Sequence, residues 1–394
     1  MCGIVACMAL ERGEAVPPLG PGMAALAHRG PDGRDSWTSP ERQVALGHTR
    51  LSIIDLQTGA QPIANEDHSS WVVVNGEFYD FERIRQDLER AGHRFRTQSD
   101  SEILLHLYEE YGTSAVHWLN GEYAFILWDE ANRELFAGRD RFGIKPLCYA
   151  VMHGRLYLAS EAKALFALGV PAALDAESVY QYIHVSQDPD RTFFAHVKQV
   201  PPGHFLLARN GTVRLVPYWD QDLDRQTSEP GQPEEEVVGR FESLLTEAVK
   251  RRLRADVPVG IYLSGGIDSA AAYALAAGAG EPPDAFTVCF DDDRYNEESD
   301  AEQLARHFGG QIDRVRLNQD NIADHFRTAI FHAEMPSHNG HIVAKYLLSR
   351  RVRERGIKVV LSGQGADEVL AGYAHFISDF HALHQTPEGR SLDD

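Results

Sequence analysis

The chain has 394 residues, of which 43% are hydrophobic and 24% charged, and this length predicts more than one domain. Lys and Arg total 38 against 58 for Asp and Glu, so the formal net charge is -20. This balance argues against nucleic-acid or anionic-membrane binding, because phosphate contacts require clustered cations. None of the four cysteines forms a CxxC pair, and no apolar run reaches the ~18 residues of a membrane span. We therefore expect a cytoplasmic protein.

The first half of the chain is predicted to be rich in β-strands. Short apolar or alternating runs recur there, namely Ile4–Met8, Val44–Gly47, Trp71–Val74, Tyr123–Trp128, Leu135–Gly138, Leu156–Ser160 and Phe205–Ala208. Turn signals such as Asn120-Gly121 and Asn210-Gly211 separate several of these runs. Helical patterns over Asp80–Ala91 and from about Ser101 complete an α+β layered domain, which we place at residues 2–218.

The second half has a different organisation. Residues 219–236 are rich in Asp, Gln, Pro, Ser, Gly and Glu, a composition typical of a linker. In residues 237–394, helical patterns alternate with the apolar runs Val257–Leu263, Phe286–Phe290 and Ile357–Leu361. This alternation predicts an α/β domain with a doubly wound parallel sheet. The basic run from Lys250 to Arg254 is interpreted as a solvated helix end.

Cys2 becomes the first residue of the chain if Met1 is removed. Its α-amine, with a pKa of about 7.7–8.0, could then accept the proton of its own thiol, as in N-terminal nucleophiles. Taken alone, the position favours another interpretation, a small buried residue that begins an edge strand, because cysteine is among the most buried residue types.

Six further motifs follow in order along the first half. They are His28-Arg29-Gly30-Pro31-Asp32-Gly33, His48-Thr49-Arg50-Leu51-Ser52-Ile53, Asn75-Gly76-Glu77-Phe78-Tyr79, Ser99-Asp100-Ser101-Glu102, Asn120-Gly121-Glu122-Tyr123-Ala124-Phe125 and Arg139-Asp140-Arg141-Phe142-Gly143-Ile144-Lys145-Pro146-Leu147. With these motifs, the sequence resembles the glutaminase half of asparagine synthetases, an N-terminal-nucleophile (Ntn) glutamine amidotransferase. The resemblance covers roughly Cys2 to Leu207.

The resemblance implies the chemistry of glutamine hydrolysis. Cys2 would attack the amide carbon. The side chain of Asn75 and the backbone N–H of Gly76 would stabilise the tetrahedral oxyanion, and one such donor contributes about 2.7–4 kcal/mol.

The resemblance also implies how the amino-acid end of glutamine is bound. Arg50 would pair with the α-carboxylate, and Asp100 with Glu77 would receive the α-ammonium, with the Ile53 backbone nearby. Considered singly, each residue favours another interpretation: Arg50 an ordinary surface arginine, and Asp100 a helix N-cap.

The motif Ser264-Gly265-Gly266-Ile267-Asp268-Ser269 lies between an apolar run and an Ala-rich helical pattern. Its glycines allow close backbone approach to a ligand, and the N–H groups at the helix start form an anion site. It lacks the lysine of a Walker A loop, so we expect it to hold pyrophosphate rather than transfer a γ-phosphoryl group. It resembles the pyrophosphate loop of ATP-dependent adenylating ligases.

A second motif, Leu361-Ser362-Gly363-Gln364-Gly365-Ala366-Asp367-Glu368, resembles the second nucleotide motif of asparagine synthetases. The resemblance implies a set of ATP contacts, namely Leu263, Ser264, Gly265, Gly266, Ile267, Asp268, Ser269, Val288, Ser362 and Gly363. It also implies that Asp268 and Asp367 hold Mg²⁺ against the phosphates. The alternative for Asp367 and Glu368 is acidic charge that complements a helix dipole.

The resemblance implies an asparagine synthetase-like reaction with ATP and Mg²⁺. Cys2 would release ammonia from glutamine, and ATP would convert a carboxylate, by default aspartate, to its adenylate. Ammonia would then form the amide. A homodimer is one assembly that the resemblance implies.

Three departures keep alternatives open. Gln364 stands where many family members have a glutamate, and the segment from Glu334 to His341 matches no acceptor pattern. Both favour the same chemistry on a different carboxylate. The sequence stops soon after the second motif, so we expect a C-terminally truncated chain that lacks a catalytic lysine, and a bare glutaminase or nucleotide-binding remnant is the remaining alternative.

Overall fold

The computed structural model describes residues 1–11, 13–184, 186–221, 232–291, 296–374 and 376–377. Residues 222–231 of the predicted linker and the last residues, 378–394, lie outside this part. The chain divides into a first unit, Met1–Gln232 with Phe331–Pro336, and a second unit, Pro233–Ile330 with Ser337–Asp394. Within the described part, no helix is both long and apolar enough to cross a membrane.

The first unit contains two six-stranded sheets whose neighbouring strands are antiparallel. One sheet has the order β10 (Lys198–Gln199), β8 (Cys148–Met152), β9 (Arg155–Ala159), β1 (Gly3–Ala9), β3 (Val44–Arg50), β2 (Gly33–Thr38). The other has the order β12 (Thr212–Pro217), β11 (His204–Arg209), β7 (Glu134–Arg139), β6 (Gly121–Asp129), β5 (Ser70–Phe78), β4 (Ile63–Ala64).

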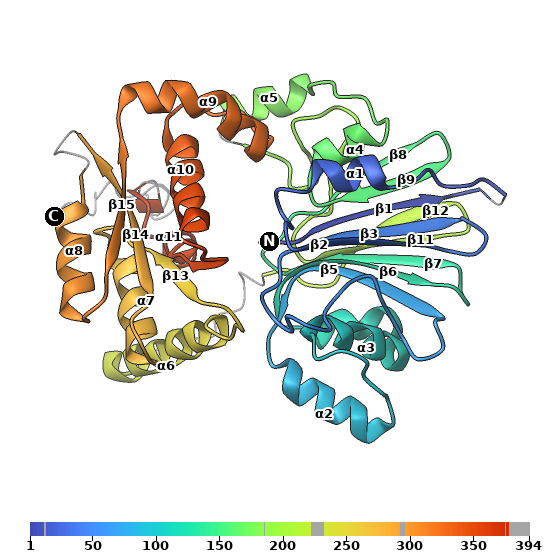
Figure 1. Ribbon diagram of the computed structural model, residues 1–394, viewed down its shortest axis with the longest axis horizontal. Helices are drawn as coiled ribbons and strands as arrows, with labels where there is room; N and C mark the ends of the chain where they lie inside the picture. The colour runs from blue at the N-terminus through green and yellow to red at the C-terminus, as the bar shows by residue number, and fades with distance from the viewer. Residues whose placement is uncertain (12, 185, 222–231, 292–295, 375, 378–394) are drawn as a thin grey trace, which may run out of the picture. The chain divides into compact units, whose positions relative to one another are not determined.

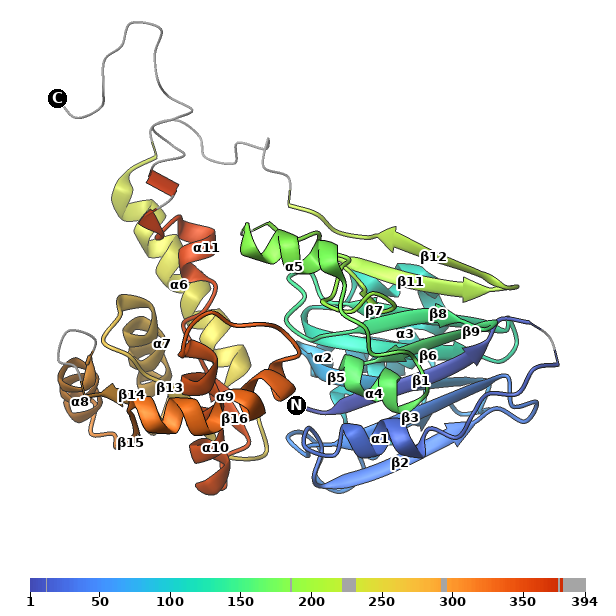
Figure 2. The same cartoon turned by 90° about the horizontal axis from the view of Figure 1, so that it is seen from above.

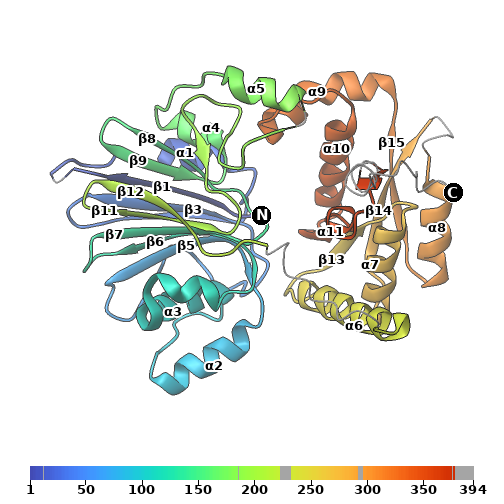
Figure 3. The ribbon, with the colours of Figure 1, turned by 180° about the vertical axis from the view of Figure 1, so that it is seen from behind.

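Helices cover the outer face of each sheet, so the first unit has four layers (Figure 1). The helices α1 (Gly20–Ala25) and α4 (Ala162–Ala167) lie side by side on the sheet that contains β1. The helices α2 (Phe81–Ala91) and α3 (Ile103–Tyr111) cover the sheet that contains β5, and the 3₁₀ turn Asp100–Glu102 leads into α3. Figure 3 shows the same layers from behind. The unit also contains the 3₁₀ segment Gly112–His117 and the helix α5 (Ala176–Ile183).

Apolar side chains alternate between the two faces of each strand and fill the spaces between these layers. In β1, Ile4, Ala6 and Met8 pack in the core between the two sheets, whereas Val5 and Cys7 pack under α1 and α4. Successive strand residues point to opposite faces, so a strand with both faces covered must be apolar throughout. This explains why β1 is fully buried. It lies between β9 and β3, which is not the edge position considered from the sequence.

The second unit contains a four-stranded parallel sheet. Its order is β15 (Ile312–Leu317), β14 (Asp284–Phe290), β13 (Val259–Tyr262), β16 (Val359–Leu361). The helices α7 (Ile267–Gly278) and α8 (Glu298–His307) bury apolar side chains on one face, and α9 (Gln319–Ala333) and α10 (His341–Glu354) on the other (Figure 2). The helix α6 (Glu234–Arg252) packs on α7, and α11 (Ala366–Leu370) follows β16.

The predicted fold classes are confirmed in both units. The first is an α+β layered fold of the Ntn-hydrolase type, and the second has a parallel sheet covered on both faces. The turn predicted at Asn210-Gly211 joins β11 to β12 in a hairpin, and both residues have positive φ. The basic residues Lys250 and Arg251 lie in the last turn of α6, as interpreted from the sequence.

Candidate functional site

Cys2 immediately precedes β1, where β3 ends. The register pairs Gly3 with Thr49, so Cys2 lies beside Arg50 and Leu51. The backbone N–H of Leu51 donates to Cys2 Sγ at 3.3 Å. Alternation from Ile4 directs Cys2 toward the space between the sheets. Burial raises the pKa of the Cys2 thiol, while the hydrogen bond from Leu51 acts in the opposite direction.

Asn75 lies near the end of β5 with a completely buried side chain. Alternation from Val73, which packs between the sheets, places Asn75 on the same inner face. Among the described residues, neither the Nδ2 nor the Oδ1 atom of Asn75 has a hydrogen-bond partner. A buried amide without partners costs free energy, about 1–3 kcal/mol for each unsatisfied group, unless a ligand satisfies it. Asn75 is therefore suited to binding an oxygen atom in this space.

Gly76 follows Asn75 in a conformation that a side chain would not tolerate. Its φ is 150°, and a Cβ atom would lie 2.0 Å from the carbonyl oxygen of Glu122 on β6. The chain needs glycine here to bring β5 and β6 together beyond Asn75. Glu77, the next residue, is half-buried and paired in register with Glu122.

Arg50, at the end of β3, is held by the loop that follows it. Its Nη2 atom donates to the carbonyl oxygen of Asp55. The Oδ2 atom of Asp55 in turn accepts from the backbone N–H of Gln98 at 2.9 Å. These contacts orient the guanidinium, so Arg50 is not an unsupported surface arginine. Ile53 lies half-buried in the same loop.

Asp100 is connected to the end of β5. Its Oδ2 atom accepts from the backbone N–H of Phe78 at 2.7 Å, and its side chain is buried. The cap of the 3₁₀ turn is Ser99, which accepts from the N–H of Ser101, so the N-cap interpretation of Asp100 is wrong. Burial raises the pKa of Asp100 to about 6, although the hydrogen bond from Phe78 opposes this. A carboxylate at this depth is suited to pairing with a cation.

The sequence-predicted glutaminase residues thus occupy one end of the sandwich. Cys2, Arg50 and Asn75 lie on inner strand faces, and hydrogen bonds through Asp55 and Gln98 connect Arg50 to the segment that carries Asp100. The arrangement combines a thiol, a buried amide, a guanidinium and a buried carboxylate. Nucleophilic attack on an amide carbon and binding of an amino acid require these groups.

An ionic network that no sequence motif predicts supports Cys2. The Nε atom of Arg29 donates to the Cys2 carbonyl at 2.8 Å, and Nη1 contacts Glu161 Oε1 at 2.7 Å. Glu161 also pairs with Lys163, and Lys163 pairs with Glu334 at 2.9 Å. Glu334 additionally accepts from the backbone N–H groups of Ala162 and Lys163 at the start of α4. The only sequence signal was the position of Arg29 within the first motif.

The motif from Arg139 to Leu147 has a structural role. The buried carboxylate of Asp140 accepts from the backbone N–H groups of Tyr123, Phe142, Ile144 and Lys145. The guanidinium of Arg139 donates to three carbonyl groups of the surrounding loops. The motif therefore fixes a loop in the first unit.

In the second unit, the Ser264–Ser269 loop connects β13 to α7. Its hydroxyl groups stabilise the turn, since Ser264 Oγ and Ser269 Oγ lie 2.9 Å apart and Ser269 Oγ donates to the Gly266 carbonyl at 3.0 Å. The backbone N–H of Gly265 donates to Glu297 Oε2 at 2.9 Å. Ser264, Gly265, Gly266 and Ile267 are exposed. The loop thus presents its backbone at the carboxyl end of the sheet.

The second motif adjoins this loop. The strand order runs from β13 to β14 and β15 on one side and to β16 on the other, so the connections reverse between β13 and β16. Such a switch point is where open α/β sheets bind ligands. A Cβ atom on Gly363 would lie 2.7 Å from the N atom of Ser269, so Gly363 packs against the start of α7. Ser362, the preceding residue, is exposed.

The remaining predicted nucleotide residues differ in their surroundings. Asp268 lies in the first turn of α7 and Asp367 in the first turn of α11, and both are half-buried. Two carboxylates on adjoining loops are a donor set that fits Mg²⁺ held together with phosphate oxygens. Leu263 is buried under α7 and α8. Val288 packs against the apolar clusters under α9 and α10.

The two units define a class of protein: an Ntn-type glutamine amidotransferase domain joined to an α/β domain with a parallel sheet. Residues 1–219 match the family model described as "Glutamine amidotransferase domain", and residues 240–391 match the model described as "Asparagine synthase". The chain belongs to the asparagine synthetase family of glutamine amidotransferases.

Relatives carry two different names. The chain is 40% identical to amidase chyE of Penicillium rubens, covering 90% of this chain and 54% of that protein. It is 36% identical to amidase chry2 of Gibberella zeae, covering 93% of this chain and 57% of that protein. It is 33% identical to asparagine synthetase [glutamine-hydrolyzing] 1 of Bacillus subtilis, covering 88% of this chain and 54% of that protein. The chain thus spans about half the length of these relatives.

Proposed function

We propose that this chain carries the glutaminase and nucleotide-binding parts of an enzyme that transfers glutamine nitrogen to a carboxylate. Cys2, freed of Met1, attacks the glutamine amide and passes its thiol proton to its own α-amine. A glutamyl thioester forms as ammonia leaves, and water then hydrolyses the thioester to glutamate. Asn75 and Gly76 stabilise the oxyanion, while Arg50 and Asp100 bind the α-carboxylate and α-ammonium, with Glu77 and Ile53 beside them.

One observation carries this proposal: the Cys2 thiol accepts the Leu51 N–H on the inner face of one sheet, and the buried Asn75 amide lies on the inner face of the other. The polar atoms of that amide lack partners among the described residues. A buried hydrogen-bonding group without a partner costs free energy of folding. A hydrogen bond to a substrate oxygen explains why the amide is retained at this position. All four cysteines are free thiols, which supports the proposed cytoplasmic location.

In the second unit, the adjoining loops around Ser264 and Gly363 bind ATP, which supplies the energy to activate an acceptor carboxylate as its adenylate. The first loop, which is exposed from Ser264 to Ile267, binds the phosphate chain once its backbone N–H groups exchange their present side-chain acceptors, such as Glu297 for Gly265, for phosphate oxygens. Asp268 and Asp367 hold Mg²⁺ there. Aspartate is the default acceptor, in line with the asparagine synthetase names among the relatives.

A second candidate is the same chemistry on a different carboxylate. Gln364 in the second motif favours it, because a neutral amide cannot act as a base there. The relatives named amidase also support this candidate.

The test is product analysis with amide-¹⁵N glutamine, ATP, Mg²⁺ and a panel of carboxylates that includes aspartate. We expect labelled ammonia or labelled amide from the wild-type chain and neither from Cys2→Ala. AMP and a labelled amide with aspartate would support the asparagine assignment, and AMP with another acceptor the second candidate. Glutamate without AMP would restrict the activity of this chain to the first unit. Glutamine turnover that persists in Cys2→Ala would contradict the proposal.

A further inference from the structure

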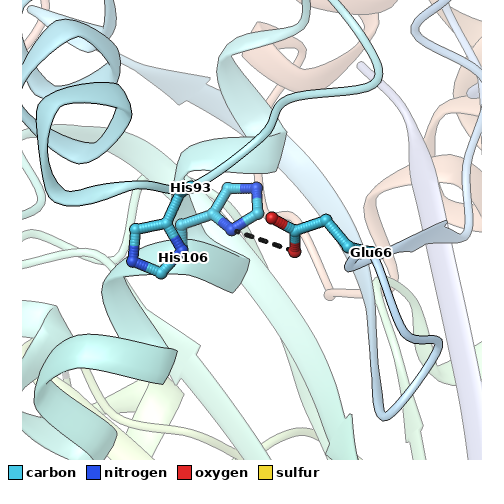
Figure 4. Close-up of side chains that lie close together, drawn as sticks. All are labelled: Glu66, His93 and His106. Atoms are coloured by element: carbon cyan, nitrogen blue, oxygen red, sulfur yellow. Dashed lines mark ion pairs between the residues drawn. The ribbon is translucent and has the colours of Figure 1, made fainter.

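Figure 4 shows a group of histidine and glutamate side chains in the helical layer that covers β5, separate from the site around Cys2. One potential ligand atom from each of Glu66, His93 and His106 lies within 4.8 Å of the others. His93 follows the C-terminal end of α2, His106 lies on α3, and Glu66 follows β4. The group therefore connects three segments that are distant in sequence.

A fourth side chain lies between the two imidazole rings. The Oε2 atom of Glu109 is 2.8 Å from His106 Nδ1 and 3.1 Å from His93 Nδ1. Glu66 Oε2 is 3.9 Å from the same His106 Nδ1 atom. His106 and Glu109 are one helical turn apart on α3, so the helix presents both on one face. Two imidazole nitrogens and two carboxylates thus converge.

Each ring also has a carboxylate at its other nitrogen. Glu110 Oε1 is 2.9 Å from His93 Nε2, and Glu102 Oε1 is 3.7 Å from His106 Nε2. Glu102 is itself fixed, since it accepts from the N–H groups of Arg96 and Thr97 and from the Thr97 hydroxyl. The Glu110 carboxylate behind the His93 ring orients a metal-binding histidine and increases its basicity. Glu102 is the nearest carboxylate to His106 Nε2, which makes no hydrogen bond among the described residues.

The two converging carboxylates are held by their second oxygen atoms. Glu66 Oε1 accepts from the backbone N–H of Arg94 at 2.8 Å. Glu109 Oε1 accepts from the side-chain amide of Asn65 at 2.6 Å. In both residues this leaves Oε2 directed at the histidines. Arg96, three residues after His93, binds His68 and the Glu66 carbonyl oxygen instead of these carboxylates.

From this geometry we infer that His93, His106, Glu66 and Glu109 form a binding site for a zinc ion. Two imidazole nitrogens and two carboxylate oxygens are a ligand set that suits Zn²⁺ better than Mg²⁺ or Ca²⁺, which prefer oxygen ligands alone. Donor atoms around a tetrahedral zinc ion are roughly 3.3 Å apart, given ligand distances of about 2.0–2.2 Å. The 2.8 and 3.1 Å contacts of Glu109 must therefore lengthen slightly and the 3.9 Å contact of Glu66 must shorten, as metal bonds replace the hydrogen bonds to Glu109.

Exposure gives the ion a route into the site and indicates its role. The Glu66 side chain is 37% exposed, whereas His106 is fully buried. The ion enters from the side of Glu66 and joins the segment after β4 to α2 and α3. Within the described part of the first unit, none of the hydrogen bonds and ion pairs of these four side chains reaches Cys2, so the role is structural: zinc stabilises the helical layer over β5.

The test is a titration of metal-free full-length chain with Zn²⁺ alone against a chromophoric chelator. It is carried out in a Cys2→Ala background, so that the N-terminal thiol does not compete for the metal. The variants are His93→Asn and Glu66→Gln, neither of which is at a fully buried position. The matched control is His68→Asn, which alters a neighbouring histidine. His68 has a positive φ, which asparagine also adopts readily. Thermal unfolding without metal checks that each variant folds.

We expect one zinc ion per chain in the parent and in His68→Asn, with a zinc-dependent rise in the unfolding temperature. Affinity should fall at least about tenfold in His93→Asn and in Glu66→Gln, and the temperature rise should disappear. Absence of stoichiometric zinc binding in the parent would overturn the inference. Equal affinity in the parent and the two site variants would overturn it as well, because the ion would then be bound elsewhere.

Discussion

Arg29 fixes the carbonyl group of Cys2 through a 2.8 Å hydrogen bond from its Nε atom, while its Nη1 atom binds Glu161. Both side chains are less than one-tenth exposed, so solvent competes weakly for these contacts. The backbone of a nucleophile that begins the chain has only one covalent neighbour after Met1 is removed. Arg29 supplies the second anchor, and we classify it as a positioning residue for the thiol.

We predict that Arg29→Met reduces kcat for glutamine hydrolysis about 10- to 100-fold, because a hydrogen bond from a charged group contributes about 1.5–3 kcal/mol. KM should change little, since Arg29 is not placed on the substrate. Steady-state glutaminase assays with wild type and the exposed-site control Arg34→Met would measure this. An unchanged kcat, or a loss confined to KM, would show that the anchor is unnecessary.

The raised pKa of Asp100 predicts a pH dependence of glutamine binding. With a pKa of about 6, the carboxyl group is charged above pH 6 and neutral below it. The proposed attraction for the α-ammonium is therefore lost as the pH falls. We expect kcat/KM, which reports the free enzyme, to decrease about tenfold per pH unit below pH 6. Asp100→Asn should lower kcat/KM and remove this limb, whereas the exposed-site control Asp87→Asn should retain it.

Gly76 should not tolerate a side chain. A Cβ atom 2.0 Å from the Glu122 carbonyl, at a φ of 150°, requires β5 or β6 to move. We expect Gly76→Ala to reduce the free energy of unfolding by at least about 1–3 kcal/mol and to abolish glutamine hydrolysis. Denaturant unfolding monitors the first effect. Gly20→Ala is the control, since its Cβ would meet nothing within 4 Å; equal stability of the two variants would contradict the prediction.

Gly363→Ala should weaken ATP binding and leave glutamine hydrolysis unchanged. The added Cβ would press on the N-terminus of α7, 2.7 Å from Ser269 N, and displace the two nucleotide loops. We expect affinity for Mg²⁺-ATP to fall about tenfold or more, which corresponds to about 1.4 kcal/mol, with unchanged glutamine hydrolysis. Calorimetric titration measures the affinity, and Gly278→Ala on the same helix is the control. Normal ATP affinity in Gly363→Ala would place the nucleotide elsewhere.

The fold was predictable where both faces of a strand are buried. The apolar pattern of β1, β5 and β6 follows directly from packing on both sides. The strand β15 was missed because charged residues interrupt its apolar pattern. In the structure these charges pair with flanking helices: Arg314 with Glu298 on α8 and Asp313 with Arg351 on α10.

The candidate site was predictable from motifs, but the contacts that hold its residues in place were not. Motifs pointed to Cys2, Arg50, Asn75 and Asp100 because each lies within a short characteristic stretch of the sequence. The contact between Lys163 and Glu334 joins residues 171 apart, and no local pattern encodes such a pairing. The same applies to the convergence of Glu66 with His93 and His106, which depends on how the helices pack.

The segment Phe331–Pro336 belongs to the first unit, although the chain on both sides of it belongs to the second. The glutaminase part is therefore discontinuous, and no single cut between residues 219 and 236 can release it intact. A recombinant piece that stops there would leave Lys163 without its Glu334 partner and α4 without the carboxylate that caps its first N–H groups. Anyone who dissects this protein should expect a weakened amino-terminal piece, which a synthetic peptide covering residues 331–336 could restore.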